Sequence, residues 1–85
     1  MNLGNKIAKL RKDSNLSQED LAEKVGVTRQ TISKWELEET SPDINQVKKL
    51  SNIFKISLDE LVNNDINNIL IKNYNIFLFL LPFTI

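Results

Sequence analysis

The sequence contains neither cysteine nor histidine. Without cysteine there are no disulfides and no thiolate nucleophiles, and without either residue the usual zinc ligands and imidazole bases are missing. The chain has 85 residues, enough for one small domain but too few to enclose a substrate cavity. Carboxylates and lysines remain as catalytic groups, yet no paired acid and base can be placed around a cleft. We therefore expect a protein that is not an enzyme and holds no metal and no cofactor.

The N-terminus also lacks the pattern of a signal peptide, a continuous apolar segment followed by a small-residue cleavage site. It reads instead as an amphipathic helix with Leu3, Ile7 and Leu10 on one face. The apolar run from Ile76 to Leu81 is too short to span a bilayer. We expect residues 1–65 to be cytoplasmic.

Charge of one sign is not in excess, since the formal net charge is zero, but the charges are unevenly distributed. Residues 1–35 carry seven Lys/Arg and four acids, a net charge of +3, and residues 36–65 carry three Lys and seven acids, a net charge of −4. A basic N-terminal half fits a polyanionic partner. The signal is weak, because a pI near 6.2 is far below that of a strongly basic nucleic-acid binder.

Helix caps and apolar periodicity predict five short helices and no strand, an all-α class. The first helix covers residues 3–13. The second opens at Ser17, with Asp20 completing an imperfect capping box, and ends at Gly26; Thr28 caps the third. The residues expected to face inward from the second and third helices are Leu21, Ala22, Val25, Ile32 and Trp35.

In the second half, Ser41 is expected to cap the fourth helix, with Pro42 at its first position. Ser57 and Glu60 form a second capping box at the start of the fifth helix. The apolar residues assigned to these two helices are Ile44, Val47, Leu50, Ile53, Phe54, Leu58, Leu61 and Val62. Residues 66–85 differ in composition, being rich in Ile, Asn, Phe and Leu, and we treat them as a separate apolar tail.

The stretch "VTRQTISKWE", residues 27–36, has apolar residues at only three of its ten positions. Ala22 is small where the second and third helices must approach, Gly26 makes the turn, and Ile32 with Trp35 anchors the third helix. Two short helices joined by a glycine-containing turn describe a helix-turn-helix. The anchors leave a polar outer face, which suits the major groove of double-stranded DNA. That face comprises Thr28, Arg29, Gln30, Thr31, Ser33 and Lys34.

The segments "LSQEDLAEKVGVTRQTISKWE" and "SPDINQVKKLSNIFKISLDELV" resemble the Cro/repressor-type, or XRE, helix-turn-helix family over about residues 3–63. The resemblance implies a five-helix domain that binds operator DNA as a dimer on inverted repeats and represses transcription. It further implies that Arg29, Gln30 and Lys34 read bases and that Gln18 touches a phosphate or base at the edge of the site. The positions that it places near phosphates or thymine methyl groups are Thr28, Thr31 and Ser33.

The resemblance also implies an ion pair between Arg11 and Glu36 that braces the first helix against the third. The chain departs from the family after Trp35, where many members have Asn-Gly and then a basic residue. Here the sequence is Leu37-Glu38-Glu39, and two carboxylates near the path of the DNA backbone would repel phosphates. We therefore expect no phosphate contact from this loop and a salt-sensitive affinity.

Several of these assignments have an alternative. The polar face of the third helix could be ordinary solvated surface, Trp35 could stack on a base rather than pack in the core, and the acids from Glu36 to Glu39 could hold a metal rather than be solvated. The chain could also be an antitoxin that binds a partner protein and its own promoter.

The tail at residues 66–85 could form a dimer contact, could have no evolved role or, least favoured, could touch a membrane. We expect a homodimer joined through the end of the fifth helix, around Leu61 and Val62, and through the tail.

Overall fold

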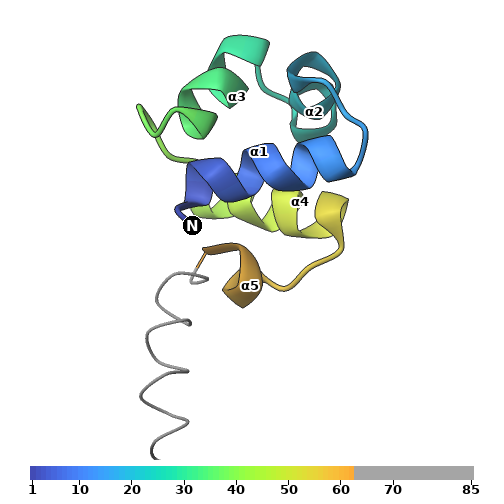
Figure 1. Ribbon diagram of the computed structural model, residues 1–85, viewed down its shortest axis with the longest axis vertical. Coiled ribbons are helices and arrows are strands. Elements are labelled where there is room, and N and C mark those ends of the chain that lie inside the picture. The colour runs from blue at the N-terminus through green and yellow to red at the C-terminus, as the bar shows by residue number, and fades with distance from the viewer. Residues whose placement is uncertain (63–85) are drawn as a thin grey trace, which may run out of the picture.

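The computed structural model describes residues 1–62, and within that range the chain forms five α-helices and no strand (Figure 1). This confirms the predicted all-α class. The helices are α1 (Leu3–Asp13), α2 (Gln18–Val25), α3 (Arg29–Glu36), α4 (Ile44–Phe54) and α5 (Leu58–Val62). The predicted tail at residues 66–85, together with its possible dimer, partner-protein and membrane contacts, lies outside the described residues.

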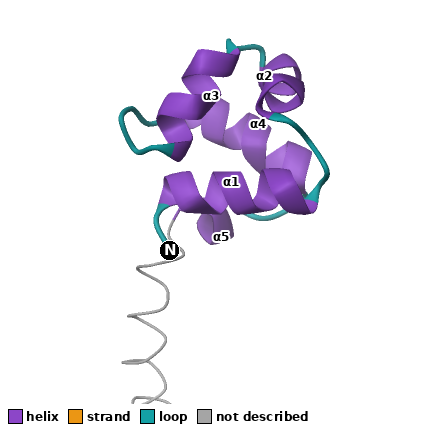
Figure 2. Ribbon diagram, turned by 45° about the horizontal axis from the view of Figure 1, so that its top comes forward, coloured by secondary structure: helices purple, strands orange, loops and turns teal. Residues whose placement is uncertain are grey.

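The helices are arranged so that α2 and α3 form one end of the described part of the chain (Figures 1 and 2). Helices α1 and α4 lie in the middle, and α5 lies at the opposite end. Within this arrangement α1 packs against both α3 and α5, and α4 packs against α2 and α5. The two middle helices therefore form the base on which α2 and α3 rest. No helix of the described part is long and apolar enough to cross a membrane.

The helix starts are set by side chains that accept hydrogen bonds from otherwise unpaired backbone N–H groups. At α2 the capping box is complete, since Ser17 Oγ accepts from the Asp20 N–H at 2.9 Å and the Asp20 carboxylate accepts from the Ser17 N–H at 2.9 Å. The backbone N–H of Ser17, and after it the Ser17 hydroxyl, stabilise the ionised Asp20 carboxylate and lower the pKa of Asp20. Thr28 caps α3 as predicted, and Ser57 Oγ accepts from the Glu60 N–H at 3.0 Å.

The predicted start of α4 was wrong. The N-cap is Asp43, not Ser41, and Pro42 precedes the helix instead of occupying its first position. Asp43 accepts from the Gln46 N–H at 2.8 Å, and the Gln46 side chain accepts from the Asp43 N–H at 2.8 Å. This reciprocal pair satisfies two backbone donors at once, which a Ser41 cap followed by Pro42 would not do.

Within residues 1–62 the core contains nine buried apolar residues, contributed by all five helices. They are Ile7, Leu21, Ala22, Val25, Ile32, Trp35, Val47, Leu50 and Leu61. Ile44, predicted in the buried stripe of α4, is 62% exposed because it is the first residue of its helix and extends past the packed part of the stripe. In α5 only Leu61 is buried, while Leu58 and Val62 are 37% and 44% exposed.

Candidate nucleic-acid interface

The turn between α2 and α3 is built around Gly26, which has a left-handed backbone with φ of +87°. A residue with a Cβ adopts this conformation only at a cost, so glycine suits the position. The N–H groups of Gly26 and Val27 both donate to the carbonyl oxygen of Ala22, at 2.8 and 3.0 Å. The Lys49 ammonium on α4 donates to the Val25 carbonyl at 3.2 Å, placing a cation at the C-terminus of α2. The turn is thus fixed by both its own backbone and α4.

The inner face of α3 is anchored by Ile32 and Trp35, which are 0% and 2% exposed. Their predicted role in the core is confirmed. A side chain buried to this degree has no face available to a nucleotide, so the base-stacking alternative for Trp35 is excluded. Ala22, 3% exposed, is the small residue of α2 in the same core.

The position of α3 also depends on Gly4 in α1, which the sequence analysis did not single out. A Cβ built on Gly4 would lie 2.4 Å from the carbonyl oxygen of Trp35 and 2.8 Å from that of Glu36. The backbones of α1 and α3 therefore meet at a distance that only glycine allows. A glycine in the first turn of a predicted helix was the available signal, because glycine weakens helices and calls for a packing reason.

The outer face of α3 carries the predicted polar residues. Four of them are exposed and two are half-buried. The exposed ones are Thr28, Arg29, Gln30 and Lys34, and the half-buried ones are Thr31 and Ser33. The Thr28 hydroxyl accepts from the Thr31 N–H at 3.2 Å and shares a 3.0 Å hydrogen bond with the Thr31 hydroxyl, so both side chains also hold the first turn of the helix.

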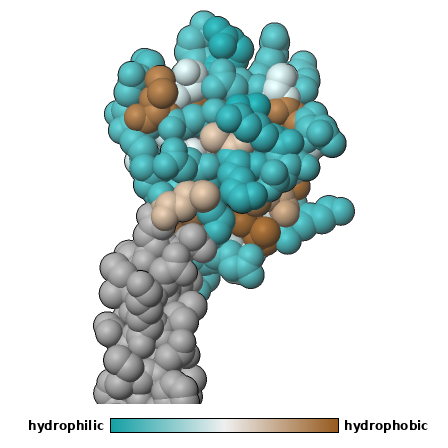
Figure 3. Space-filling view, in the orientation of Figure 1, coloured by the Kyte–Doolittle hydropathy of each residue, from teal (hydrophilic) through white to brown (hydrophobic). Residues whose placement is uncertain are grey.

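A mainly hydrophilic surface covers α2 and α3 (Figure 3). Arg29, Gln30 and Lys34 offer guanidinium, amide and ammonium donors there.

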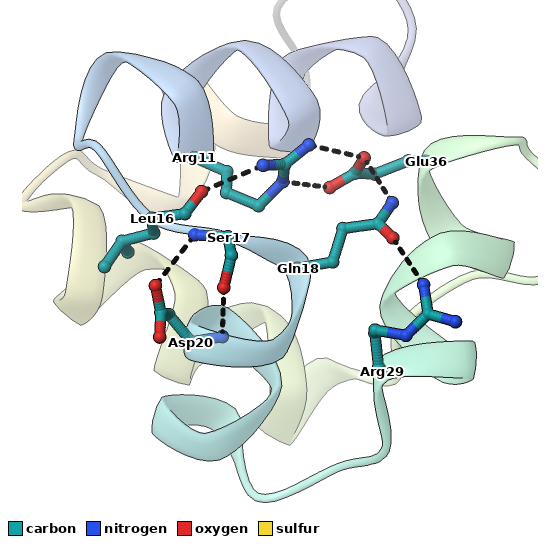
Figure 4. Close-up of polar contacts among 7 residues, drawn as sticks. All are labelled: Arg11, Leu16, Ser17, Gln18, Asp20, Arg29 and Glu36. Carbon is teal, nitrogen blue, oxygen red and sulfur yellow. Dashed lines mark hydrogen bonds and ion pairs between the residues drawn. The ribbon is translucent and has the colours of Figure 1, made fainter.

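The predicted ion pair between Arg11 and Glu36 is present (Figure 4). Arg11 Nε donates to Glu36 Oε2 at 2.7 Å and Arg11 Nη2 donates to Glu36 Oε1 at 3.2 Å, a two-bond contact between guanidinium and carboxylate. Arg11 Nη1 donates to the Leu16 carbonyl at 2.8 Å. The two side chains are only 11% and 9% exposed. This pair joins α1, the α1–α2 loop and the end of α3, so Glu36 is not part of a solvated acidic run as the sequence suggested.

Gln18 extends this network toward the outer face of α3 (Figure 4). Its Nε2 donates to Glu36 Oε1 at 3.1 Å, and its Oε1 accepts from Arg29 Nη1 at 3.3 Å. The sequence placed Gln18 at the edge of the DNA site but did not connect it to Arg29 or Glu36. Sequence spacing carries no signal for this connection, because the three residues come from different helices or opposite ends of one helix.

The loop after α3 is acidic and partly strained. Glu38 has φ of +62°, a left-handed conformation that residues with a Cβ rarely adopt. The N–H of Glu39 donates to the Lys34 carbonyl at 2.9 Å, which folds the loop back onto the end of α3. Leu37 is 66% exposed, and Glu38 and Glu39 are exposed as well. Two solvent-facing carboxylates therefore lie beside the C-terminal end of α3.

Helices α2 and α3, with the short turn between them, define a helix-turn-helix protein. The family model described as "Helix-turn-helix" matches residues 7–61, well over half of the chain. The chain belongs to the Cro/repressor-type (XRE) helix-turn-helix family.

The relatives of the chain are transcription regulators rather than enzymes. It is 38% identical over 65 residues to the HTH-type transcriptional activator BcrR of Enterococcus faecalis, covering 76% of this chain and 32% of that protein. It is 34% identical over 64 residues to the cryptic phage CTXphi transcriptional repressor RstR of Vibrio cholerae, covering 75% of this chain and 58% of the relative. The chain thus spans less than two thirds of the length of both.

Among solved structures, the chain resembles the P22 c2 repressor protein in complex with a synthetic operator. The TM-score is 0.70 and the identity 34%, over 73% of this chain and 94% of that one.

Proposed function

We propose that this chain is a sequence-specific DNA-binding transcription regulator that represses genes by occupying an operator through α3. The observation that carries the proposal is the division of α3 into two faces. Ile32 and Trp35 fix its inner face in the core, and this holds the donors of Arg29, Gln30 and Lys34 outward on a rigid helix. A helix of this kind fits the major groove, where base edges present acceptors and donors in a sequence-dependent pattern.

In the proposed complex Arg29, Gln30 and Lys34 read bases. Arg29 and Gln30 are the first two residues of α3, and the N-terminal residues of a recognition helix are the ones that reach base edges. Thr28, Thr31 and Ser33 lie beside them and supply contacts to phosphates or thymine methyl groups. Gln18 retains a second amide hydrogen for a contact at the edge of the site.

Repression is favoured over activation because two of the similar proteins are repressors. RstR is a transcriptional repressor, and the c2 protein is a repressor whose structure contains operator DNA. BcrR, by contrast, is a transcriptional activator. In vitro transcription from a promoter that overlaps the bound site tests the direction. We expect fewer transcripts as the protein is added, and an increase would reverse the assignment to activation.

DNA binding itself is tested by selecting bound duplexes from a random pool with the full chain. We expect a motif made of two inverted half-sites. A variant carrying Arg29→Ala, Gln30→Ala and Lys34→Ala is the matched control, because all three residues are exposed and their loss leaves the core intact. The proposal fails if the full chain enriches no motif, or if this triple variant enriches the same one.

We further propose that the chain binds as a homodimer. One helix reads too few base pairs to select a single site in a genome, and two copies related by a twofold axis place their recognition helices about 34 Å apart, one turn of DNA. The expected contact around Leu61 requires correction, because Leu61 is 1% exposed and faces the core. Leu58 and Val62 are the exposed apolar residues of α5, and apolar side chains are visible around α5 in Figure 3.

Sedimentation of the full chain tests the assembly. We expect a dimer at tens of micromolar, and Val62→Asp to shift it toward monomer without unfolding it, because this residue is exposed. A full-length monomer that protects a single half-site would contradict the dimer.

A further inference from the structure

Two arginines belong to the polar network, and each donates from Nη1 to an oxygen atom (Figure 4). Arg11 donates from Nη1 to a carbonyl oxygen, that of Leu16, and from its Nε–Nη2 edge to the two oxygens of Glu36. Arg29 donates from Nη1 to the amide oxygen of Gln18. Within residues 1–62, however, nothing bonds to the Nε–Nη2 edge of Arg29. The Nε–Nη2 edge, which donates to two acceptors in Arg11, is therefore available for a ligand in Arg29, at the exposed start of α3.

The orientation of the Gln18 amide is determined by Glu36. An ionised carboxylate only accepts hydrogen bonds, so the Gln18 NH₂ group must face Glu36 and the amide oxygen must face Arg29. A flipped amide would direct its oxygen at the carboxylate and its N–H groups at the guanidinium, losing both hydrogen bonds. Glu36 is itself held by Arg11. A chain of hydrogen bonds therefore runs from α1 through the end of α3 and the start of α2 to Arg29.

We propose that Gln18, oriented by Glu36, is a positioning residue for Arg29, and that the open edge of Arg29 reads a guanine. This inference rests on the proposed DNA-binding function. Guanine presents two acceptors, O6 and N7, in the major groove, which match the Nε–H and Nη2–H donors as the Glu36 oxygens match those of Arg11. Adenine offers N7 beside an N–H donor, thymine offers one acceptor, and cytosine offers a donor. Only guanine satisfies both N–H groups.

Positioning has a thermodynamic consequence for specificity. An arginine held by a neighbour loses less conformational freedom when it binds, so more of its interaction with the correct base appears as affinity. Releasing Arg29 from Gln18 leaves the donors in place but lets them reach other acceptors. We therefore expect the loss of Gln18 to lower discrimination at one base pair more than it lowers binding overall.

The experiment uses the motif found by selection with the full chain. The base pair at which Arg29→Ala relaxes the preference is identified first and is expected to contain guanine. Affinities are then measured for three duplexes that carry guanine, 7-deazaguanine or adenine at that position. The proteins are wild type, Gln18→Met, Arg29→Ala and the double variant. Gln30→Met is the matched control, because it makes the same amide-to-thioether exchange at an exposed position of the site, whereas Gln18 is half-buried.

We expect the wild type to prefer guanine over both other bases by about tenfold or more, the discrimination of a bidentate pair. Gln18→Met is expected to reduce this ratio several-fold, and to leave it unchanged when Arg29 is already alanine, because Gln18 acts through Arg29. Gln30→Met is expected to relax a different base pair. The proposal is overturned if Gln18→Met weakens all three duplexes by the same factor and so leaves the preference for guanine unchanged, since that is the behaviour of a phosphate contact alone.

A second measurement needs no DNA. The order parameter of the Arg29 Nε–H bond, from ¹⁵N relaxation of the full chain, is expected to fall in Gln18→Met and to stay unchanged in Gln30→Met. Equal mobility in wild type and Gln18→Met would overturn the positioning role. If selection enriches no motif, the proposed function fails and the guanine assignment falls with it, while this relaxation measurement still decides whether Gln18 holds Arg29.

Discussion

Gly4 lies against the carbonyl oxygen of Trp35, so closely that a Cβ on Gly4 would be 2.4 Å from that oxygen. Alanine normally strengthens a helix relative to glycine by about 1 kcal/mol. At this position the added methyl group would force the backbones of α1 and α3 apart, and both belong to the core that supports the proposed DNA-binding face.

We therefore predict that Gly4→Ala lowers the free energy of unfolding by about 1–3 kcal/mol, the usual cost of overpacking. Urea denaturation of the full chain measures the change. Asn5→Ala is the control, because Asn5 is the exposed neighbour in the same helix and should tolerate alanine. An increase in stability with Gly4→Ala would show that α1 and α3 can separate without cost.

The proposed base-reading residues give a second prediction. Arg29→Ala and Gln30→Ala should each weaken binding to the selected operator by about 1–3 kcal/mol and relax the preference at one base pair. Lys48→Ala should have much less effect, since Lys48 is an exposed residue of α4 outside the proposed interface. Fluorescence anisotropy with labelled duplexes measures all three. A comparable loss with Lys48→Ala would mean that a different face enters the groove.

Glu38 provides a third prediction through its left-handed backbone, with φ of +62°. Glycine avoids the steric cost of this conformation, although it adds backbone entropy to the unfolded chain. Because the steric cost is the larger of the two, Glu38→Gly should stabilise the fold by about 0.5–1 kcal/mol. Glu38→Gln removes the same charge while keeping the side chain, and it should give no such gain in thermal denaturation.

The same two variants separate charge from strain in DNA binding. Both remove a carboxylate beside the end of α3, so both should tighten operator binding to a similar extent at low salt. A tightening confined to Glu38→Gly would assign the effect to loop conformation, contrary to our expectation of electrostatic repulsion.

Asp20 provides a fourth prediction, on the dependence of stability on pH. The hydrogen bonds with Ser17 lower the pKa of Asp20 below its ordinary value of 3.8 in the folded state. A lowered folded-state pKa means that this carboxylate stabilises the fold above its unfolded pKa. The contribution is lost as pH falls through the folded-state pKa.

Asp20→Asn should therefore make the loss of stability between about pH 5 and pH 2 shallower. Urea midpoints across that range measure it. Glu19→Gln is the control, an exposed carboxylate of the same turn for which residues 1–62 provide no hydrogen bond. An unchanged pH dependence in Asp20→Asn would remove Asp20 from the acid response.

The first three helices were predictable because their signals are local. Caps at Ser17 and Thr28 and a glycine at position 26 are read from a few adjacent residues, and the inward position of Ile32 and Trp35 follows from helical spacing. The ion pair between Arg11 and Glu36 could be expected only from the family resemblance, because 25 positions separate its two members.

The remaining features depend on competition or on contacts between helices. At α4 Ser41 was the expected cap, but the reciprocal bonds of Asp43 and Gln46 set the start of the helix two residues later. The approach of Gly4 to Trp35 depends on the packing of α1 against α3. The link from Gln18 to Arg29 depends on side-chain placement in three dimensions. None of these leaves a periodic pattern in the sequence.

The division of α3 into a buried and an outward face has an evolutionary consequence. Gln30 and Lys34 are exposed and do not belong to the core, so under the proposed function a descendant of this chain can change its operator without first losing its fold. Arg29 is different, because it shares a hydrogen bond with Gln18. We expect base preference to change readily through substitutions at Gln30 and Lys34. A change at Arg29 should require a compensating substitution at Gln18.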